Sequence, residues 1–356
     1  MRLTYCWTEP SGYLAACIAE LAGRPGVEVS LLTWEIHESA PFSTAALGGS
    51  HARVLGRRER DDGPLVERLV AETNPDVVFI SGWAHPPYTG LLKSPRLTGV
   101  KFVMGADTPI RFDWRQRLAP FRIGGLLRRL DGVVVPGERG YQLMRYWGVP
   151  GRKVTRLLYG IDYRLFAGAG AARCTGGAPW PRSFLFAGRY VDVKGLDLLI
   201  DAYRSYRRAV ADPWPLLTCG TGPLATMLAA EPGVTDLGFL QPAELAQAFQ
   251  RAGVFVLPSR HEPWGQVIVE AAAAGLPVIC TQACGAGADV VRDFHNGLVV
   301  PTADAPALAW AFRWMHGHAD RLPGMGASAQ VAAAAYGAER WADTQVAMAS
   351  RIAAAD

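Results

Sequence analysis

Short apolar runs alternate along the whole chain with longer segments in which apolar residues recur at helical spacing. Such runs are typical of strands buried on both faces of a sheet, and the longer segments are typical of amphipathic helices. The alternation predicts an α/β fold, with parallel sheets covered by helices on both faces. The predicted strands are 2–6, 27–32, 76–81, 100–104, 132–136 and 154–159 in the first half, and 183–188, 215–219, 253–258 and 277–281 in the second.

One stretch interrupts this alternation. Residues 167–181 (AGAGAARCTGGAPWP) are rich in Gly and Ala and show no periodicity, which is typical of a linker. We therefore expect two doubly wound, Rossmann-like domains, 1–166 and 182–335, facing a central cleft. Residues 336–356 have the pattern of a further helix, which we expect to pack back on the first domain.

Composition narrows the class of protein. Of 356 residues, 50% are hydrophobic and 19% are charged, as in ordinary globular proteins. A net charge of +4 is too small for a dedicated nucleic-acid binder but suits a groove for phosphate-bearing small molecules. Six cysteines without a CxxC pair predict free thiols in a reducing compartment. With no apolar run of membrane-spanning length and no signal-peptide pattern, we expect a cytoplasmic protein.

The segment HEPWGQVIVEAAAAGLP predicts a helix over 263–274 that follows the strand 253–258. Its first turn therefore lies at the carboxyl end of a parallel strand, where doubly wound folds bind ligands. Backbone N–H groups near Gly265, Gln266 and Val267, together with the helix dipole, form a predicted anion site. Gly265 has no side chain, so a ligand can approach the backbone closely.

Two carboxylates belong to this segment. Glu262 stands at the mouth of the helix, where it could act only as a cap, and Glu270 stands about two turns further along. A solvated position is one interpretation of Glu270, but its apolar neighbours leave little polar face. A carboxylate in such surroundings needs partners, and the paired hydroxyls of a ribose would supply them.

A second constellation lies in FAGRYVDVKG. A strand ends at Gly188, Arg189 follows it, and Lys194 opens the next helix. A guanidinium fork and an ammonium are both suited to a diphosphate. The alternative is a pair of surface cations, and the presence of both residues in the same half as Glu262 and Glu270 favours the site.

These motifs, in this order, resemble the retaining GT-B glycosyltransferases of family 4. The resemblance covers most of residues 155–310 and includes LLYGIDYRLF (157–166), G-R-x4-K-G, CGTGP (219–223), LGFL (237–240), PSRHEPWGQVIVEAAAAGLPVI (258–279) and NGLVVP (296–301). It implies a nucleotide-diphospho-sugar donor (a UDP- or GDP-sugar) in the second domain. It further implies transfer, with retention of configuration, to a glycan, glycolipid or small-metabolite hydroxyl that enters from the first domain.

The resemblance also implies roles for individual residues. Arg189 and Lys194 neutralise the diphosphate, Glu270 binds the ribose, and Glu262 holds donor-sugar hydroxyls. The predicted donor site comprises Gly188, Arg189, Lys194, Gly220, Phe239, Glu262, Gly265, Gln266, Val267 and Glu270, with Gly220 and Phe239 bordering the base. Glu262, Arg189 and Lys194 are expected to carry catalysis, because fixed charge stabilises the departing diphosphate. The chain lacks a D-x-D motif, so we expect no metal ion and no cofactor.

The first half is similar to the family mainly in architecture. Gly12 follows the first strand and allows acceptor and donor to meet. Where members of the family often carry a histidine after a middle strand, this chain has VMGADTP, with Asp107. His85, in SGWAHPPY, follows another strand and is the alternative. Gly12, His85 and Asp107 are therefore the acceptor-side candidates.

Residues 111–130 interleave arginines with apolar side chains. The arginines are Arg111, Arg115, Arg117, Arg122, Arg128 and Arg129, and they stand among Phe112, Trp114, Leu118, Phe121, Leu126 and Leu127. One interpretation is a solvated amphipathic helix. The other is contact with an anionic membrane surface at the inner face, or with a lipid-linked acceptor. The Gly124–Gly125 pair argues against one continuous helix.

Two alternative functions remain open. A nucleotide-sugar epimerase of similar architecture would bind the same donor without an acceptor. A non-catalytic partner subunit would have no evident need for the complete set of Arg189, Lys194, Glu262 and Glu270. A dehydrogenase is disfavoured because no G-x-G-x-x-G follows the first strand, and we expect no nucleic-acid partner.

Overall fold

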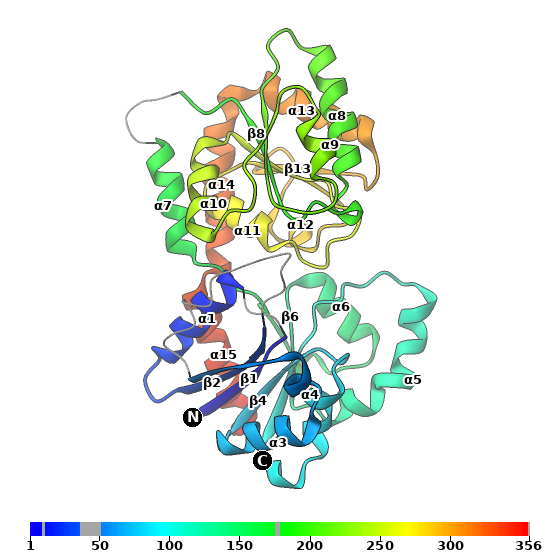
Figure 1. Ribbon diagram of the computed structural model, residues 1–356, viewed down its shortest axis with the longest axis vertical. Coiled ribbons are helices and arrows are strands. Elements are labelled where there is room, and N and C mark those ends of the chain that lie inside the picture. Colours follow the sequence, from blue (N-terminus) through cyan, green and yellow to red (C-terminus); the bar gives the residue numbers. More distant parts are fainter. Residues whose placement is uncertain (9–10, 36–50, 175–178, 355–356) are drawn as a thin grey trace. The chain divides into compact units, whose positions relative to one another are not determined.

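The computed structural model describes residues 1–8, 11–35, 51–174 and 179–354. The chain forms two compact units. Unit 1 comprises Met1–Ile161 and Ala338–Asp356, and unit 2 comprises Asp162–Gly337. Figure 1 shows unit 1 in blue to teal together with the red helix at the C-terminal end, and unit 2 in green to orange.

Unit 1 contains a seven-stranded parallel sheet in the order β3-β2-β1-β4-β5-β6-β7. The strands are β1 (Arg2–Cys6), β2 (Glu28–Trp34), β3 (His51–Leu55), β4 (Val77–Ser81), β5 (Lys101–Gly105), β6 (Gly132–Val135) and β7 (Val154–Arg156). The order reverses between β1 and β4, so the carboxyl ends of these strands border the crevice where such folds bind ligands.

The sequence-based strand set for unit 1 omitted β3, and this omission was wrong. β3 lies at the edge of the sheet, and β2 is its one neighbour among the described strands. Ala52, Arg53 and Val54 are exposed, and Leu55 is buried. An edge strand with so little buried surface carries no apolar run, so the pattern that marks the central strands is missing here.

The helices of unit 1 are α1 (Gly12–Ala22), α2 (Arg57–Arg60), α3 (Gly63–Glu72), α4 (Pro86–Gly90), α5 (Trp114–Arg129), α6 (Glu138–Tyr146) and α15 (Ala338–Ala353). The C-terminal helix α15 packs against α1, although more than 300 residues separate them in the chain. Trp341 of α15 is buried, and its indole Nε1 donates to the carbonyl of Leu158 at 2.9 Å. The last helix is therefore part of the core of unit 1.

Unit 2 contains a six-stranded parallel sheet in the order β10-β9-β8-β11-β12-β13. Its strands are β8 (Phe184–Ala187), β9 (Leu216–Cys219), β10 (Val234–Asp236), β11 (Val254–Leu257), β12 (Val278–Thr281) and β13 (Gly297–Val300). Its helices are α7 (Tyr163–Cys174), α8 (Leu196–Ala209), α9 (Ala225–Ala229), α10 (Pro242–Arg251), α11 (Gln266–Ala273), α12 (Gly285–Val290), α13 (Ala305–Gly317) and α14 (Leu322–Ala333). Here the order reverses between β8 and β11.

The predicted linker 167–181 is corrected by α7, which occupies its first part and belongs to unit 2. Gly170 lets the helix approach α11 closely, since a Cβ there would lie 2.7 Å from the carbonyl oxygen of Ala274. The Arg173 guanidinium donates to the carbonyls of Ala274 (2.8 Å) and Phe249 (2.5 Å). The Gly- and Ala-rich composition that predicted a linker therefore reflects small residues that let α7 pack closely against its neighbours. Residues 175–178 of the predicted linker lie outside the described residues.

The division between the units falls after Ile161, not at the predicted residue 166. The predicted α/β class with two doubly wound, parallel-sheet units is confirmed. Among the helices that the structure describes, none combines the length and the apolar character needed to cross a bilayer.

Candidate active site in unit 2

The helix α11 begins later than expected. The predicted range was 263–274, but α11 starts at Gln266. The carbonyl of Trp264 accepts a hydrogen bond from the N–H of Ala286 at 2.7 Å, so the preceding residues pair with the start of α12 and do not join the helix. Gly265 turns the chain into α11 with φ of +92°, a left-handed conformation that favours glycine. α11 still follows β11 directly in the order of elements, so its N-terminus lies on the side of the carboxyl ends of the strands.

Glu262 and Lys194 form an ion pair at this edge. The Lys194 Nζ donates to the Glu262 carboxylate across the loops that follow β8 and β11. Their side chains are 14% and 12% exposed. Ser259, which is fully buried, also donates to the Glu262 carboxylate at 3.4 Å. The predicted catalytic cation and carboxylate are therefore neighbours, and solvent reaches both only slightly.

A second ion pair fixes the same two loops. The Arg260 guanidinium binds both carboxylate oxygens of Asp197, at 2.6 and 2.5 Å. The backbone N–H of Arg260 donates to the carbonyl of Val193 at 2.8 Å. Arg260 therefore holds the loop with Glu262 against the turn with Lys194. This pair holds the pKa of Asp197 below its usual range, mainly through the hydrogen bonds from Arg260.

Arg189 is exposed at the end of β8, and its guanidinium has no partner among the described residues. The next residue, Tyr190, is buried and donates from its hydroxyl to the Asp236 carboxylate at 2.6 Å. The backbone of Gly188 lies so close to Gly220 that a Cβ on Gly220 would be 1.9 Å from the Gly188 carbonyl oxygen. The turn that carries Arg189 is thus fixed while its cation stays free.

Glu270 lies inside α11 and is largely buried. Desolvation raises the pKa of its carboxyl to about 7. Its carboxylate forms no hydrogen bond or ion pair with any residue that the structure describes. The side chain keeps some solvent access, so a ligand could reach it. Because the Glu270 carboxylate is desolvated and still partly accessible, it can accept hydrogen bonds from the hydroxyls of a bound ligand.

The remaining donor-side candidates lie around these groups. Gln266 begins α11, and its Oε1 accepts from the Trp264 indole Nε1 at 2.9 Å. Val267 follows in the first turn and is partly buried. Phe239 is partly buried in the segment that follows β10, and the backbone N–H of Gly220 donates to the carbonyl of Gly238 at 2.8 Å. The Phe239 segment therefore borders the loop that follows β9.

The acceptor-side candidates Gly12, His85 and Asp107 belong to unit 1. They follow β1, β4 and β5, which are neighbouring strands, so all three stand at the carboxyl edge of that sheet. Asp107 is exposed and accepts from the Tyr159 hydroxyl at 3.3 Å. Gly12 begins α1, after the N-cap residue Ser11.

His85 is a buried histidine, not an exposed base. Only 8% of it is exposed, and its ring packs edge-on against Trp34 and Tyr88. Its Nε2 lies 3.6 Å from an Asp61 oxygen, and neither ring nitrogen has a hydrogen-bond partner among the described residues. Burial lowers the pKa of His85. The lowered pKa favours the neutral form of the imidazole.

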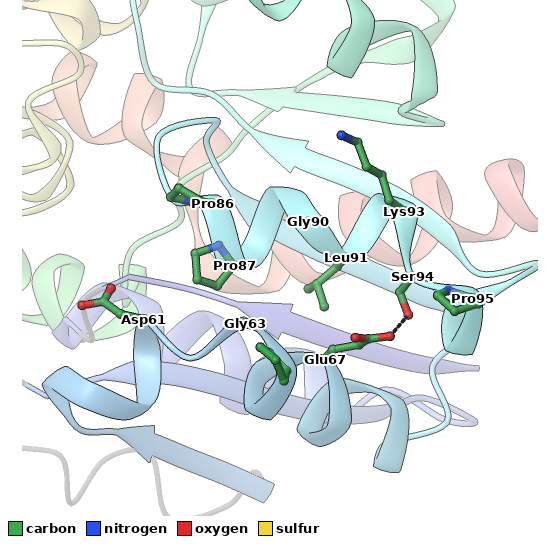
Figure 2. Close-up of a pocket in the computed structure, with 11 residues that line it drawn as sticks. Asp61, Gly63, Glu67, Pro86, Pro87, Gly90, Leu91, Lys93, Ser94 and Pro95 are labelled. Atoms are coloured by element: carbon green, nitrogen blue, oxygen red, sulfur yellow. Dashed lines mark hydrogen bonds between the residues drawn. The ribbon is translucent and has the colours of Figure 1, made fainter.

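A surface pocket of about 470 Å³ lies beside this histidine, between α3 and α4. Figure 2 shows Asp61, Pro86 and Pro87 at one end and the Glu67–Ser94 hydrogen bond of 2.5 Å at the other. Of the predicted acceptor residues, His85 lies next to the pocket: its Nε2 is 3.6 Å from Asp61, and Pro86 follows it in the chain. None of the predicted site residues lines it.

Sequence reasoning missed the residues that position this site: Asp197, Arg260, Tyr190 and Asp236. Each of the four stands within three residues of a predicted residue, which is the only signal that the sequence offers. Their pairing depends on two loops meeting in space. Among the described residues, no group of three or more His, Cys, Asp or Glu side chains could hold a metal ion.

Comparisons with known proteins define the class first. Unit 2 matches, over residues 181–318, the family model described as "Glycosyl transferases group 1". Residues 10–160 match the model described as "Glycosyl transferase 4-like domain". A sucrose-phosphate synthase from Thermosynechococcus elongatus has the same fold, with a TM-score of 0.74, 19% identity and coverage of 100% of both chains. Fold and motifs together define a GT-B glycosyltransferase.

Sequence relatives then give the family. A GDP-mannose-dependent alpha-(1-6)-phosphatidylinositol monomannoside mannosyltransferase of Mycobacterium tuberculosis is 31% identical over 294 residues, which is 75% of this chain and 74% of that protein. A D-inositol 3-phosphate glycosyltransferase of Streptomyces bingchenggensis is 34% identical over 185 residues, 46% of this chain, and the chain covers only 40% of its length. The chain belongs to the group 1 glycosyltransferases, and the resemblance drawn from its motifs is confirmed.

Proposed function

We propose that this chain transfers a sugar from a nucleotide-diphospho-sugar to a hydroxyl of a glycan, glycolipid or small metabolite, with retention of configuration and without a metal ion. The observation that carries this proposal is Glu270. Its carboxylate is desolvated, unpartnered among the described residues and partly accessible. The two vicinal hydroxyls of a ribose would satisfy both of its oxygens.

With the ribose at Glu270, we place the diphosphate at the N-terminus of α11. The helix N-terminus offers backbone N–H donors and a positive dipole end. Arg189 adds an exposed cation that has no partner in the part of the chain that the structure describes, and Lys194 adds a second cation held by Glu262. These groups supply the charge that a D-x-D motif and a divalent ion would otherwise provide.

In the transfer step, the bond between the anomeric carbon and the diphosphate oxygen breaks, and the electron pair leaves with the diphosphate. The acceptor oxygen forms the new bond on the face from which the diphosphate departs, and its proton passes to the leaving group. Arg189 and Lys194 stabilise the charge as it develops. Glu262 orients donor-sugar hydroxyls beside them, and no nucleophile from the chain is required.

For the donor, we infer a UDP- or GDP-sugar. The name of the mycobacterial relative places GDP-mannose first among the donors to test. The acceptor enters from unit 1, where Gly12, His85 and Asp107 stand at one sheet edge. The described cysteines other than Cys174 are free and buried, which supports a cytoplasmic site of action.

The proposal is tested by incubating the chain with GDP-mannose or UDP-glucose and with candidate acceptors in EDTA. We expect nucleoside diphosphate release that depends on the acceptor, and a product whose one-bond carbon–proton coupling at the anomeric carbon shows the same configuration as the donor. An inverted product would contradict retention, and activity lost in EDTA but restored by Mg²⁺ would contradict metal independence. Conversion of the donor without any acceptor would favour an epimerase.

A further inference from the structure

The helix α5 presents one face to the core of unit 1 and the other to solvent. Gln116 and Leu127 are buried, and Ile123 packs against the core cluster. Gln116 also donates to the carbonyl of Pro109 at 2.8 Å, which fixes the helix start. The helix runs through the Gly124–Gly125 pair, contrary to the prediction of a break, because Ile123 and Leu127 anchor it on both sides. Figure 1 shows α5 at the margin of unit 1, beside α6.

Large apolar side chains occupy the solvent face. Trp114 (66% exposed), Leu118 (51%) and Phe121 (88%) recur at i, i+4 and i+7 and therefore form one stripe. Phe112 (62%) precedes them, and the centroid of its ring lies 5.8 Å from that of the Tyr146 ring (45%) on α6. We call these five residues the α5 stripe. They are half of the ten exposed large apolar side chains in the described part of the chain.

Arginines flank the α5 stripe on both sides. At 3.6 residues per turn, Arg117 and Arg128 fall on one side of it, and Arg115, Arg122 and Arg129 fall on the other. The helix contains no Asp or Glu. None of these five arginines forms an ion pair with a carboxylate of the described residues. The face is therefore both apolar and strongly cationic.

The combination of apolar and cationic side chains distinguishes between two candidate partners, a second copy of this chain and an anionic bilayer. In a symmetric dimer through this face, each patch would meet its own copy, so arginines would face arginines across the interface. A bilayer with anionic headgroups accommodates both features, because the rings enter the boundary with the acyl chains while the guanidinium groups bind lipid phosphates. We propose that the α5 stripe and its arginines dock this chain on the surface of an anionic lipid bilayer.

The docking surface has a consequence for the acceptor. α5 follows β5 through a short connection that contains Asp107, so its first turn lies at the carboxyl edge of the unit 1 sheet. That edge also carries His85 and Gly12. Docking would bring the edge to the membrane surface, where a lipid-linked hydroxyl is available. Binding to the bilayer requires neither donor nor transfer, so it is testable separately from the proposed function.

Vesicle flotation of the full chain tests the proposal. We expect binding to vesicles of phosphatidylcholine mixed with phosphatidylglycerol, weak binding to phosphatidylcholine alone, and release at high salt. Arg117→Gln with Arg122→Gln should weaken binding roughly 25-fold, at about fivefold for each arginine. Phe121→Ser should weaken it about tenfold or more. Since Phe121 is 88% exposed, its replacement should leave the thermal midpoint unchanged.

Control variants remove the same charge, or another exposed apolar side chain, elsewhere in the chain. Arg57→Gln with Arg58→Gln, on the exposed face of α2, and Val331→Ser, at a site 77% exposed on α14, should bind vesicles like the wild type. Absence of binding to anionic vesicles would overturn the proposal, as would equal binding by the α5 variants and the wild type. A dimer that Phe121→Ser dissolves, in a chain that ignores vesicles, would also overturn it and assign the face to self-association.

Discussion

Glu270 is the residue whose chemistry distinguishes this site most clearly from an ordinary helix surface. A carboxyl with its pKa raised to about 7 is uncharged in much of the folded population at neutral pH. Ribose hydroxyls donate to the charged form, so donor binding and ionisation support each other. Glu270 could be predicted as a ligand-binding residue because its apolar neighbours leave little polar face on the helix for its carboxylate.

Replacing Glu270 tests both consequences. The charged form is disfavoured in the folded state, so wild-type stability should fall as pH rises from about 4.5 through about 7. Glu270→Gln removes this loss and should be more stable than the wild type at pH values above 7, by up to about 3 kcal/mol for the roughly 2.5-unit shift. The two chains should have equal stability near pH 4. Urea unfolding across this range measures the difference, and parallel pH profiles would contradict the burial of Glu270.

The same variant should bind nucleoside diphosphate more weakly. Losing a pair of hydrogen bonds to a charged group should cost about 10- to 100-fold in affinity. Wild-type affinity should rise as pH increases through about 7, and that of Glu270→Gln should stay flat. Calorimetric titration measures both. Unchanged affinity would remove the ribose from this position.

Lys194 should act mainly on the rate. Lys194→Ala removes a cation that stabilises the departing diphosphate and leaves Glu262 without its ion pair. We expect kcat to fall about 100- to 1,000-fold, with a smaller change in KM. Lys93→Ala, at an exposed position on unit 1, is the matched control. A variant that keeps its kcat would show that Lys194 has only a structural role.

At the scale of elements, α7 illustrates how one side chain attaches a helix. Arg173 is 8% exposed and donates to the carbonyls of Phe249, Gln250, Ala274 and Gly275. Arg173→Ala removes the hydrogen bonds that the guanidinium donates to these four carbonyls, so we expect a loss of about 3 kcal/mol or more in the stability of unit 2. Arg182→Ala, at an exposed position, should change little. Equal melting temperatures for the two variants would contradict this account of α7.

Elements buried on both faces could be predicted from the sequence, and elements defined by a neighbour could not. The central strands of both sheets were marked by their apolar runs. β3 is recognised only through its pairing with β2, and α7 only through its contacts with α10 and α11. The start of α11 was misplaced because the carbonyl of Trp264 pairs with Ala286, twenty-two residues further along the chain.

The candidate site shows the same limit: residues in local motifs could be predicted, and contacts between distant segments could not. Arg189, Lys194, Glu262 and Glu270 could be identified because each stands in a local motif. The sequence could not show that Lys194 pairs with Glu262, nor that Arg260 with Asp197 holds the two loops together. Such contacts join strands β8 and β11, which are adjacent only in the sheet. Residue types near strand ends predict a site, and the topology decides which of them meet.

At the scale of the whole molecule, each unit should respond separately to damage. Trp341 belongs to unit 1 and is 2% exposed in its core. Trp341→Ala should lower the stability of unit 1 by about 3–5 kcal/mol. Because the proposed donor site belongs to unit 2, nucleotide affinity should be unchanged. Chemical unfolding and calorimetric titration of the same preparation check both statements, and a large loss of nucleotide affinity would contradict a donor site confined to unit 2.

The most direct test of the donor site is a thermal-shift panel with UDP, GDP, ADP and TDP, each with and without EDTA. A ligand at 100 times its Kd adds about 2.7 kcal/mol to the folded state that binds it. In a unit of this size, the melting temperature should rise by roughly 5–10 °C. We predict such a shift for UDP or GDP, retained in EDTA and lost in Glu270→Ala. No shift from any nucleotide, or an equal shift in Glu270→Ala, would contradict the site that we have assigned to unit 2.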